Sequence, residues 1–268
     1  MNEKVLAIQD LSCVGQCSLT VVLPILSHYG IETAILPTAV LSNHTMFNGW
    51  SYLDLTGELD NIYNYWQNND FKFNGFLLGY LGKKDIMTLC EKAFEKFSAT
   101  GAKVIIDPVF GDNGKLYGGF DGEYVKEMAS FIKNADVIIP NLTEASFLTG
   151  KEYKETYDLS YIEDMIDGLK ALTDGVIIIT GVQKDGKIGE AIYADGKITY
   201  VYDEKLPVCY HGTGDIFASV FTAHYLSGKS LEFSCARAGE FVAKCIKATP
   251  AEHFYGVKFE SVLKEECK

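Results

Sequence analysis

The chain lacks several features that mark common classes of protein. No apolar run approaches the roughly 20 residues of a membrane-spanning helix, and residues 1–9 are too short and too polar for a signal peptide. Lysine and arginine do not cluster, and the formal net charge is −12. Because a nucleic-acid backbone requires a basic surface, this charge argues against DNA or RNA as a partner. We therefore expect a globular protein with no membrane and no nucleic-acid partner.

Several ligand-binding motifs are also absent. There is no Gly-x-x-x-x-Gly-Lys-Ser/Thr loop, no Gly-x-Gly-x-x-Gly after the first apolar run, and no His-Glu-x-x-His pair among the five histidines. These absences argue against a Walker-type loop, a dinucleotide fold and a zinc hydrolase. The seven cysteines contain no Cys-x-x-Cys pair, and most lie in apolar segments. This pattern favours reduced thiols in a cytoplasmic protein, the alternative being a redox or metal pair of Cys13 and Cys17.

Short apolar runs alternate with helical patterns along most of the chain. Continuous β-branched runs separated by helices are typical of a parallel sheet covered on both faces. Residues 187–202 instead alternate about Asp195-Gly196, which is a hairpin signal. Because composition does not shift and no linker is evident, we expect one domain over residues 1–268. The expected strands are 5–9, 33–36, 75–79, 104–106, 137–139 and 176–180, and the expected helices are 18–29, 59–66, 84–97, 122–132, 159–172, 215–226 and 230–248.

The segment Gly212-Thr213-Gly214-Asp215 is the most informative part of the sequence. It precedes an apolar run typical of a buried helix, and its glycines allow a sharp turn that brings backbone N–H groups close to a ligand. A helix N-terminus offers unpaired N–H donors and a partial positive charge, which suit a phosphate. Asp215 is badly placed to hold an anion but well placed to take a proton from a hydroxyl group. The pattern indicates phosphoryl transfer to an alcohol, and the alternative is an ordinary helix N-cap.

Polar residues follow most of the expected strands. Ligands of open α/β sheets bind beyond the carboxyl ends of the strands, so these side chains should converge on one edge together with Asp215. Carboxylates gathered there suit Mg²⁺ beside a polyphosphate. Each residue alone could instead cap a helix or close a turn, as Thr143 could, and His211 could line a nucleotide pocket or simply pack. The residues at the strand ends are Asp10, Tyr80, Asp107, Asp112, Asn141, Thr143, Glu144 and Thr180.

Several short segments resemble the ribokinase-like small-molecule kinases. Three of them are similar to that superfamily as a whole: Gly212–Asp215, Asp107–Val109 and Pro140–Glu144. Four are similar to its pyridoxal kinase branch: Ala7–Gln9, Leu41–Thr45, Gly79–Gly82 and Asp107–Asp112. The resemblance implies a three-layer α/β/α sandwich with a mostly parallel central sheet. It also implies ATP-dependent phosphorylation of the 5′-hydroxymethyl group of a vitamin B6 compound.

The same resemblance implies roles for individual residues. Asp215 would be the general base, and the amides of Gly212, Thr213 and Gly214 would form the anion hole. Mg²⁺, its waters and the phosphates would be held by Asp107, Asp112, Asn141 and Glu144. The nucleotide would contact Thr180 and Tyr117, and the pyridine ring would face Thr45 and Tyr80. A monovalent cation such as K⁺ near the loop and a homodimer also follow from the resemblance.

One position departs from the family pattern. Where the family usually has Ser-His after Ala-Ile-Gln, this chain has Asp10-Leu11, and the loop that follows lacks the usual aromatic residues. We hypothesise that Asp10 pairs with an amino group of the ligand and favours pyridoxamine over pyridoxal, although desolvation of both charges offsets part of the gain. The alternative is that Asp10 caps a turn and never touches substrate.

Other functions remain open on the sequence alone. A hydroxymethylpyrimidine kinase of thiamine synthesis is the nearest competitor, because its substrate also carries a primary alcohol and an exocyclic amine. A sugar or nucleoside kinase is less favoured, since the early Gly-Gly-rich segment of sugar kinases is missing. A non-catalytic carrier of pyridoxal phosphate belongs to a different class, and it would not need Asp215.

Overall fold

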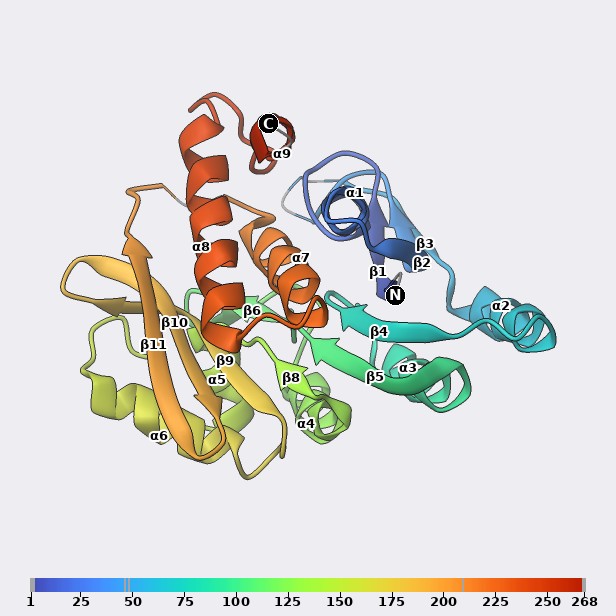
Figure 1. Ribbon diagram of the computed structural model, residues 1–268, viewed down its shortest axis with the longest axis horizontal. Helices are drawn as coiled ribbons and strands as arrows, with labels where there is room; N and C mark the ends of the chain where they lie inside the picture. Colours follow the sequence, from blue (N-terminus) through green and yellow to red (C-terminus); the bar gives the residue numbers. More distant parts are fainter. Residues whose placement is uncertain (1–2, 46, 48, 209, 267–268) are drawn as a thin grey trace.

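A central sheet runs through the whole molecule. The computed structural model describes residues 3–45, 47, 49–208 and 210–266. Within these residues the chain forms one large sheet, whose strands run across Figure 1 from one side to the other. Their order is β11 (Lys197–Glu204), β10 (Lys187–Ala194), β9 (Val176–Lys184), β8 (Val137–Ile138), β5 (Ser98–Ile106), β4 (Phe73–Leu78), β1 (Lys4–Ser12), β2 (Glu32–Leu41) and β3 (Tyr52–Asp54).

The six central strands of the sheet are parallel, as the sequence predicts; in sheet order they are β2, β1, β4, β5, β8 and β9. The remaining strands β3, β10 and β11 pair antiparallel at the two sides of the sheet. The turn between β10 and β11 has positive φ at both Asp195 and Gly196, which confirms the hairpin signal. Because parallel strands all end at the same edge, the polar residues that follow them are gathered there.

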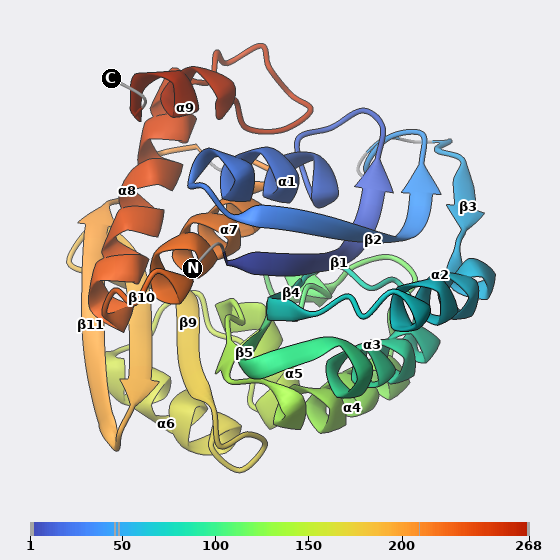
Figure 2. The same ribbon diagram turned by 45° about the vertical axis from the view of Figure 1, so that its right-hand side comes forward.

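Helices cover both faces of the sheet and make three layers (Figure 2). Side chains of the central strands alternate between two apolar cores: Leu6 and Ile8 of β1 lie in one, and Val5 and Ala7 in the other. The predicted α/β/α sandwich is therefore confirmed. One face carries α1 (Leu19–His28), α7 (Thr213–Leu226) and α8 (Leu231–Ala248), with α9 (Glu260–Glu266) beside α8; the other carries α2 (Thr56–Asn68), α3 (Lys84–Phe97), α4 (Gly122–Phe131), α5 (Leu142–Thr149) and α6 (Leu159–Leu169).

The structure also contains elements that the sequence did not predict. Strand β3 has three exposed residues and no alternating pattern, and α5 is buried on nearly every side, so neither shows the expected periodicity. A small hairpin of β6 (Gly111–Asp112) and β7 (Lys115–Leu116) lies apart from the large sheet. The predicted helix 122–132 ends at Phe131 and continues as the short 3₁₀ helix η1 (Ile132–Asn134), and the predicted helix 159–172 ends at Leu169. No helix in the described part of the chain is long and apolar enough to cross a bilayer.

Candidate active site

The glycine loop forms the beginning of helix α7. Gly212 is the residue before the helix, with φ of 86°, and Thr213, Gly214 and Asp215 make up the first turn. The N–H groups of this turn have no partner within the helix and carry its partial positive charge. The Thr213 hydroxyl donates to the Tyr210 carbonyl at 3.1 Å and does not cap the helix. The arrangement leaves backbone donors available to an anion.

Asp215 is not the cap of its own helix. Its Oδ2 accepts a 2.9 Å hydrogen bond from the backbone N–H of Ser18, a residue 197 positions earlier in the chain. Ser18 precedes α1, and α1 packs against α7 (Figure 2). Although Asp215 keeps some exposed surface, removal from water raises its pKa to about 7, with a smaller contribution from the charge of Asp10. A carboxylate with a pKa near neutrality is suited to general-base chemistry.

One further carboxylate, that of Asp107, lies beside the glycine loop, and the charge of Glu144 acts on Asp107 in turn. A Cβ atom placed on Gly214 would be 3.7 Å from Asp107 Oδ2, so the Asp107 carboxylate faces the first turn of α7. Asp107 and Glu144 are both buried. Burial raises the pKa of each, that of Glu144 to about 8, and the charges of Glu144 and Asp215 add to the effect at Asp107. In the described residues no lysine or arginine forms an ion pair with any of these acids.

This donor set fits a divalent cation. Buried carboxylates that repel one another and have no basic partner are stabilised by a bound metal ion, which supplies the missing positive charge. The described residues contain no group of three or more His, Cys, Asp or Glu side chains arranged to hold a metal alone. Mg²⁺ commonly takes one or two carboxylates and completes its shell with water and phosphate oxygens. The arrangement therefore suits a metal that arrives with a nucleotide.

Asn141 and Glu144 also have a structural role at the start of α5. The Asn141 side chain accepts from the N–H groups of Thr143 and Glu144, and Glu144 accepts from the Asn141 N–H at 2.8 Å, which makes a capping box. The cap is Asn141, so the alternative that Thr143 caps this helix is wrong. Asn141 Nδ2 donates to the Gly111 carbonyl at 2.9 Å, and the other Glu144 oxygen accepts from the Phe110 N–H at 3.2 Å. The cap thereby ties α5 to the segment that follows Asp107.

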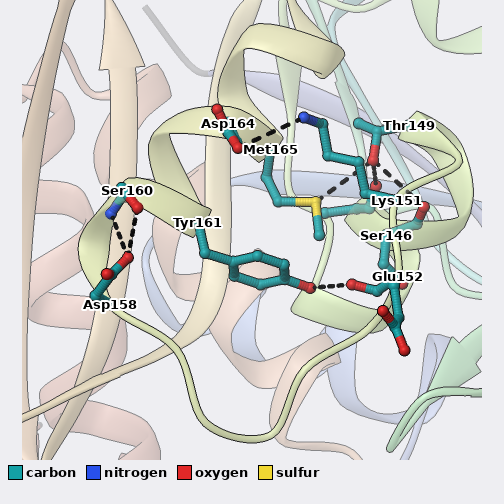
Figure 3. Close-up of polar contacts among 10 residues, drawn as sticks. Ser146, Thr149, Lys151, Glu152, Asp158, Ser160, Tyr161, Asp164 and Met165 are labelled. Atoms are coloured by element: carbon teal, nitrogen blue, oxygen red, sulfur yellow. Dashed lines mark hydrogen bonds and ion pairs between the residues drawn. The ribbon is translucent and has the colours of Figure 1, made fainter.

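The far end of α5 is fastened to α6 (Figure 3). Lys151 lies 4.0 Å from the Asp164 carboxylate, and the Tyr161 hydroxyl donates to the Glu152 carbonyl at 2.8 Å. Thr149 contacts the Met165 sulfur at 3.4 Å. These contacts hold α5 in place. Asn141 is the cap of this short helix, and Glu144 lies in its first turn.

The other residues predicted to bind the nucleotide, and Asp112, which was predicted to bind the metal, lie in or follow strands that end at the same edge. Thr180 is joined to Asn141 by an isolated β-bridge, and its N–H donates to the Pro140 carbonyl at 3.0 Å. Asp112 is exposed in the hairpin of β6 and β7, where it accepts from the N–H and Nδ2 of Asn113. Tyr117 follows this hairpin, and burial together with the charge of Glu144 raises its pKa. His211 is exposed, and its ring lies 5.5 Å from that of His44.

A second group of residues surrounds Asp10. Strand β1 changes its register against β2 between Gln9 and Leu11, so Asp10 lies at a local irregularity of the strand. Asp10 is buried and accepts from the hydroxyls of Ser18 at 2.5 Å and Ser12 at 2.9 Å. Burial raises the pKa of Asp10 despite these two bonds. Burial, with the charge of Asp10 next, raises the pKa of Tyr80 to about 12, which places the Tyr80 ring near this carboxylate.

Thr45 lies in the loop that follows β2. It occupies an exposed turn, and within the described residues no hydrogen bond joins it to Asp10 or Tyr80. Sequence reasoning missed Ser18, because a serine before a helix has the ordinary appearance of an N-cap, and it missed Ser12, because nothing in the sequence distinguishes this serine at the end of β1. Two surface cavities lie away from the site, one of about 310 Å³ between α8 and α9 and one of about 250 Å³ along α6.

The fold and this site together define a small-molecule kinase of the ribokinase-like class. The family model of phosphomethylpyrimidine kinase matches residues 61–257. The pyridoxal kinase of Dictyostelium discoideum is 30% identical over 239 residues, which cover 82% of this chain and 77% of that protein. The chain belongs to this kinase family and is of the pyridoxal kinase type.

Solved structures of this kinase family are also similar to the chain. A putative phosphomethylpyrimidine kinase from Bacteroides thetaiotaomicron, crystallised with pyridoxal, is 37% identical, with a TM-score of 0.92 and coverage of 100% of this chain and 96% of that one. Pyridoxal kinase from Lactobacillus plantarum is 33% identical, with a TM-score of 0.91 and coverage of 99% and 96%. These similarities confirm the ribokinase-like fold that the sequence motifs imply.

Proposed function

We propose that this chain transfers the terminal phosphoryl group of ATP to the 5′-hydroxymethyl group of a vitamin B6 compound. The observation that carries the proposal is the position of Asp215, in the first turn of α7, beside the backbone N–H groups of the helix N-terminus and with a pKa of about 7. The similarity to named pyridoxal kinases, and the pyridoxal in a crystal of a 37% identical relative, support the acceptor.

The residues of the site divide the reaction between them. Asp215 takes the proton of the substrate hydroxyl as the hydroxyl oxygen attacks the terminal phosphorus and the bond to the leaving ADP breaks. The N–H groups of Gly212, Thr213 and Gly214 stabilise the charge on the transferring group. Asp107, Asp112 and Glu144 would hold Mg²⁺, directly or through its waters, and the metal would neutralise phosphate charge. Thr180, Tyr117, Asn141 and His211 would contact the nucleotide, and Tyr80 and Thr45 the pyridine ring.

Further features of the proposal come from the family resemblance. We expect K⁺ or a similar cation near the glycine loop, a homodimer, and one functional domain over residues 1–268. The five cysteines that the structure describes are all free, three of them buried, which supports action in the reducing cytoplasm. Cys209 and Cys267 lie outside the described residues.

A second candidate is phosphorylation of hydroxymethylpyrimidine, because a hydroxymethylpyrimidine/phosphomethylpyrimidine kinase of Aquifex aeolicus is 31% identical over 186 residues. A coupled assay of ADP release with pyridoxal, pyridoxamine, pyridoxine and hydroxymethylpyrimidine separates the two. Mass spectrometry of the products then locates the phosphate. We expect the highest kcat/KM with a B6 compound. A higher value with the pyrimidine would replace the proposal, and no turnover with any acceptor would leave a carrier of pyridoxal phosphate.

A further inference from the structure

A chain of hydrogen bonds connects Asp10, Ser18 and Asp215. The Ser18 hydroxyl donates to Asp10 Oδ1 at 2.5 Å, and the Ser18 backbone N–H donates to Asp215 Oδ2 at 2.9 Å. Ser12 occupies the second Asp10 oxygen at 2.9 Å. Asp10, Ser12 and Ser18 are all at most 4% exposed. The network therefore runs through a buried region from strand β1 to the first turn of α7.

The backbone of Ser18 is unusual. Its φ is 51° and its ψ is −138°, a combination that residues other than glycine rarely adopt. Ser18 also precedes helix α1, where a serine side chain normally accepts from a helix N–H, yet it makes no such bond. Its hydroxyl is turned to Asp10 instead. Strained backbone of this kind persists only where the surroundings hold it, and the bond to Asp10 is one such restraint.

We propose that Asp10 is a positioning residue for the general base, because its bond to the Ser18 hydroxyl keeps the Ser18 N–H directed at Asp215. This inference rests on the phosphotransferase function proposed above. An N–H on one oxygen fixes the rotation of the Asp215 carboxylate and leaves Oδ1 to take the substrate proton. In this role Asp10 affects the rate of phosphoryl transfer to every acceptor by the same factor. The positioning role differs from the role expected from the sequence, in which Asp10 forms an ion pair with the amino group of pyridoxamine. To form that ion pair, Asp10 would have to give up or share its hydrogen bonds with the two serines.

Two variants of Ser18 test the restraint on the backbone. Ser18→Ala removes the hydroxyl but keeps a Cβ atom, so the strained conformation loses its anchor and we expect kcat to fall about tenfold or more. Ser18→Gly also removes the hydroxyl, yet glycine adopts this conformation without strain, so its kcat should exceed that of Ser18→Ala by about tenfold. KM for pyridoxal should change by less than about threefold in both. Equal losses of kcat in the two variants would overturn the inference.

A double-mutant cycle tests whether the effect passes through Asp215. Combined with Asp215→Asn, Ser18→Ala should cause little further loss of kcat, because the base that it positions is already gone. If the double variant lost kcat by the product of the two separate factors, the inference would be contradicted. Asp10→Asn keeps an acceptor for Ser18 without the charge. It should therefore leave the ratio of kcat/KM for pyridoxamine and pyridoxal unchanged, and a shifted ratio would assign Asp10 to the substrate instead.

The amide resonance of Ser18 provides a readout that does not require turnover. In ¹⁵N-labelled protein, the Ser18 N–H signal should move upfield in Asp215→Asn, because the Ser18 N–H loses its charged acceptor. Asp10→Leu, which removes the acceptor for the Ser18 hydroxyl, should move it as well. Asp195→Ala is the matched control, because Asp195 has φ of 50° in a distant hairpin. If wild-type protein phosphorylates no acceptor, the proposed function fails, and the resonance still decides whether Asp10 controls the Ser18 amide. A Ser18 signal indifferent to Asp10→Leu would overturn the inference.

Discussion

Gly212 lies directly against the backbone carbonyl of Gln16. A Cβ atom at Gly212 would be 1.9 Å from Gln16 O, and the φ of Gly212 is 86°. The Gln16 side chain is in turn held by His253 at 2.8 Å and by Glu260 at 2.6 Å. The loop before α1 and the glycine loop before α7 are therefore packed so closely that no side chain fits between them at Gly212.

We expect Gly212→Ala to damage both stability and activity. The methyl group would meet a backbone atom that cannot turn aside, in addition to the roughly 1–2 kcal/mol that a left-handed conformation costs an L-residue. Gly228→Ala is the control, since Gly228 has φ of 76° but open space around its Cβ position. Urea unfolding should show a larger loss for Gly212→Ala, and its kcat should fall while that of Gly228→Ala is kept. Similar results for the two variants would mean that the contact with Gln16 is unimportant.

Asp215→Asn should lower kcat by about 10²–10⁴ while binding of ADP is retained, because the amide cannot accept the proton of the attacking hydroxyl. Steady-state kinetics with pyridoxal and calorimetric titration with ADP measure the two effects. Asp136→Asn is a matched control, because Asp136 pairs with Lys103 away from the site. A variant at Asp215 that keeps nearly full kcat would assign this residue to structure alone.

Asp107→Asn should raise the concentration of Mg²⁺ needed for half-maximal activity by about 10- to 100-fold, as the loss of a metal partner does elsewhere. The physical reason is that Asp107 supplies one of two buried charges with no basic partner. The measurement is a Mg²⁺ titration at saturating ATP. Asp203→Asn is the control, since Asp203 is a carboxylate remote from the glycine loop, beside Gly239 of α8. An unchanged Mg²⁺ requirement for Asp107→Asn would remove Asp107 from the metal site.

Glu190 should make stability depend on pH. Burial, together with the charge of Asp203, raises its pKa from 4.5 to about 8, and Glu190 Oε2 has no hydrogen-bond partner among the residues that the structure describes. Below pH 4.5 the residue is protonated in both folded and unfolded protein. As pH rises from there toward 8, the unfolded state releases the proton first, so stability falls by up to about 1.4 kcal/mol per pH unit.

The matched variant is Glu190→Gln, which has the same shape and does not titrate. Urea unfolding at pH 5 should give similar free energies for wild type and variant. At pH 8.5 the variant should be more stable by about 1 kcal/mol or more, because nothing ionises inside the sheet. A difference between the two proteins that does not grow with pH would show that Glu190 is not kept protonated by burial.

Local sequence was sufficient for much of the fold. Helix α3 was predicted at its observed bounds because its buried residues recur on one side of the helix. The glycine loop and Asp215 were found for a similar reason, since turn and helix signals are adjacent in the chain. Helix α5 was missed because almost all of its residues are buried, which leaves no polar face to give a period.

The sequence alone determined the alternation of strands and helices, the loop from Gly212 to Asp215, and the edge of the sheet where polar residues gather. Only the tertiary structure decided that Ser18 donates to Asp215, that Asp107 faces Gly214, and that Asp10 is enclosed by serines. Parallel strands and their crossover helices bring together residues separated by a hundred positions or more, and the loss of water there sets the pKa values. Neither proximity nor desolvation is encoded in any short stretch of the chain.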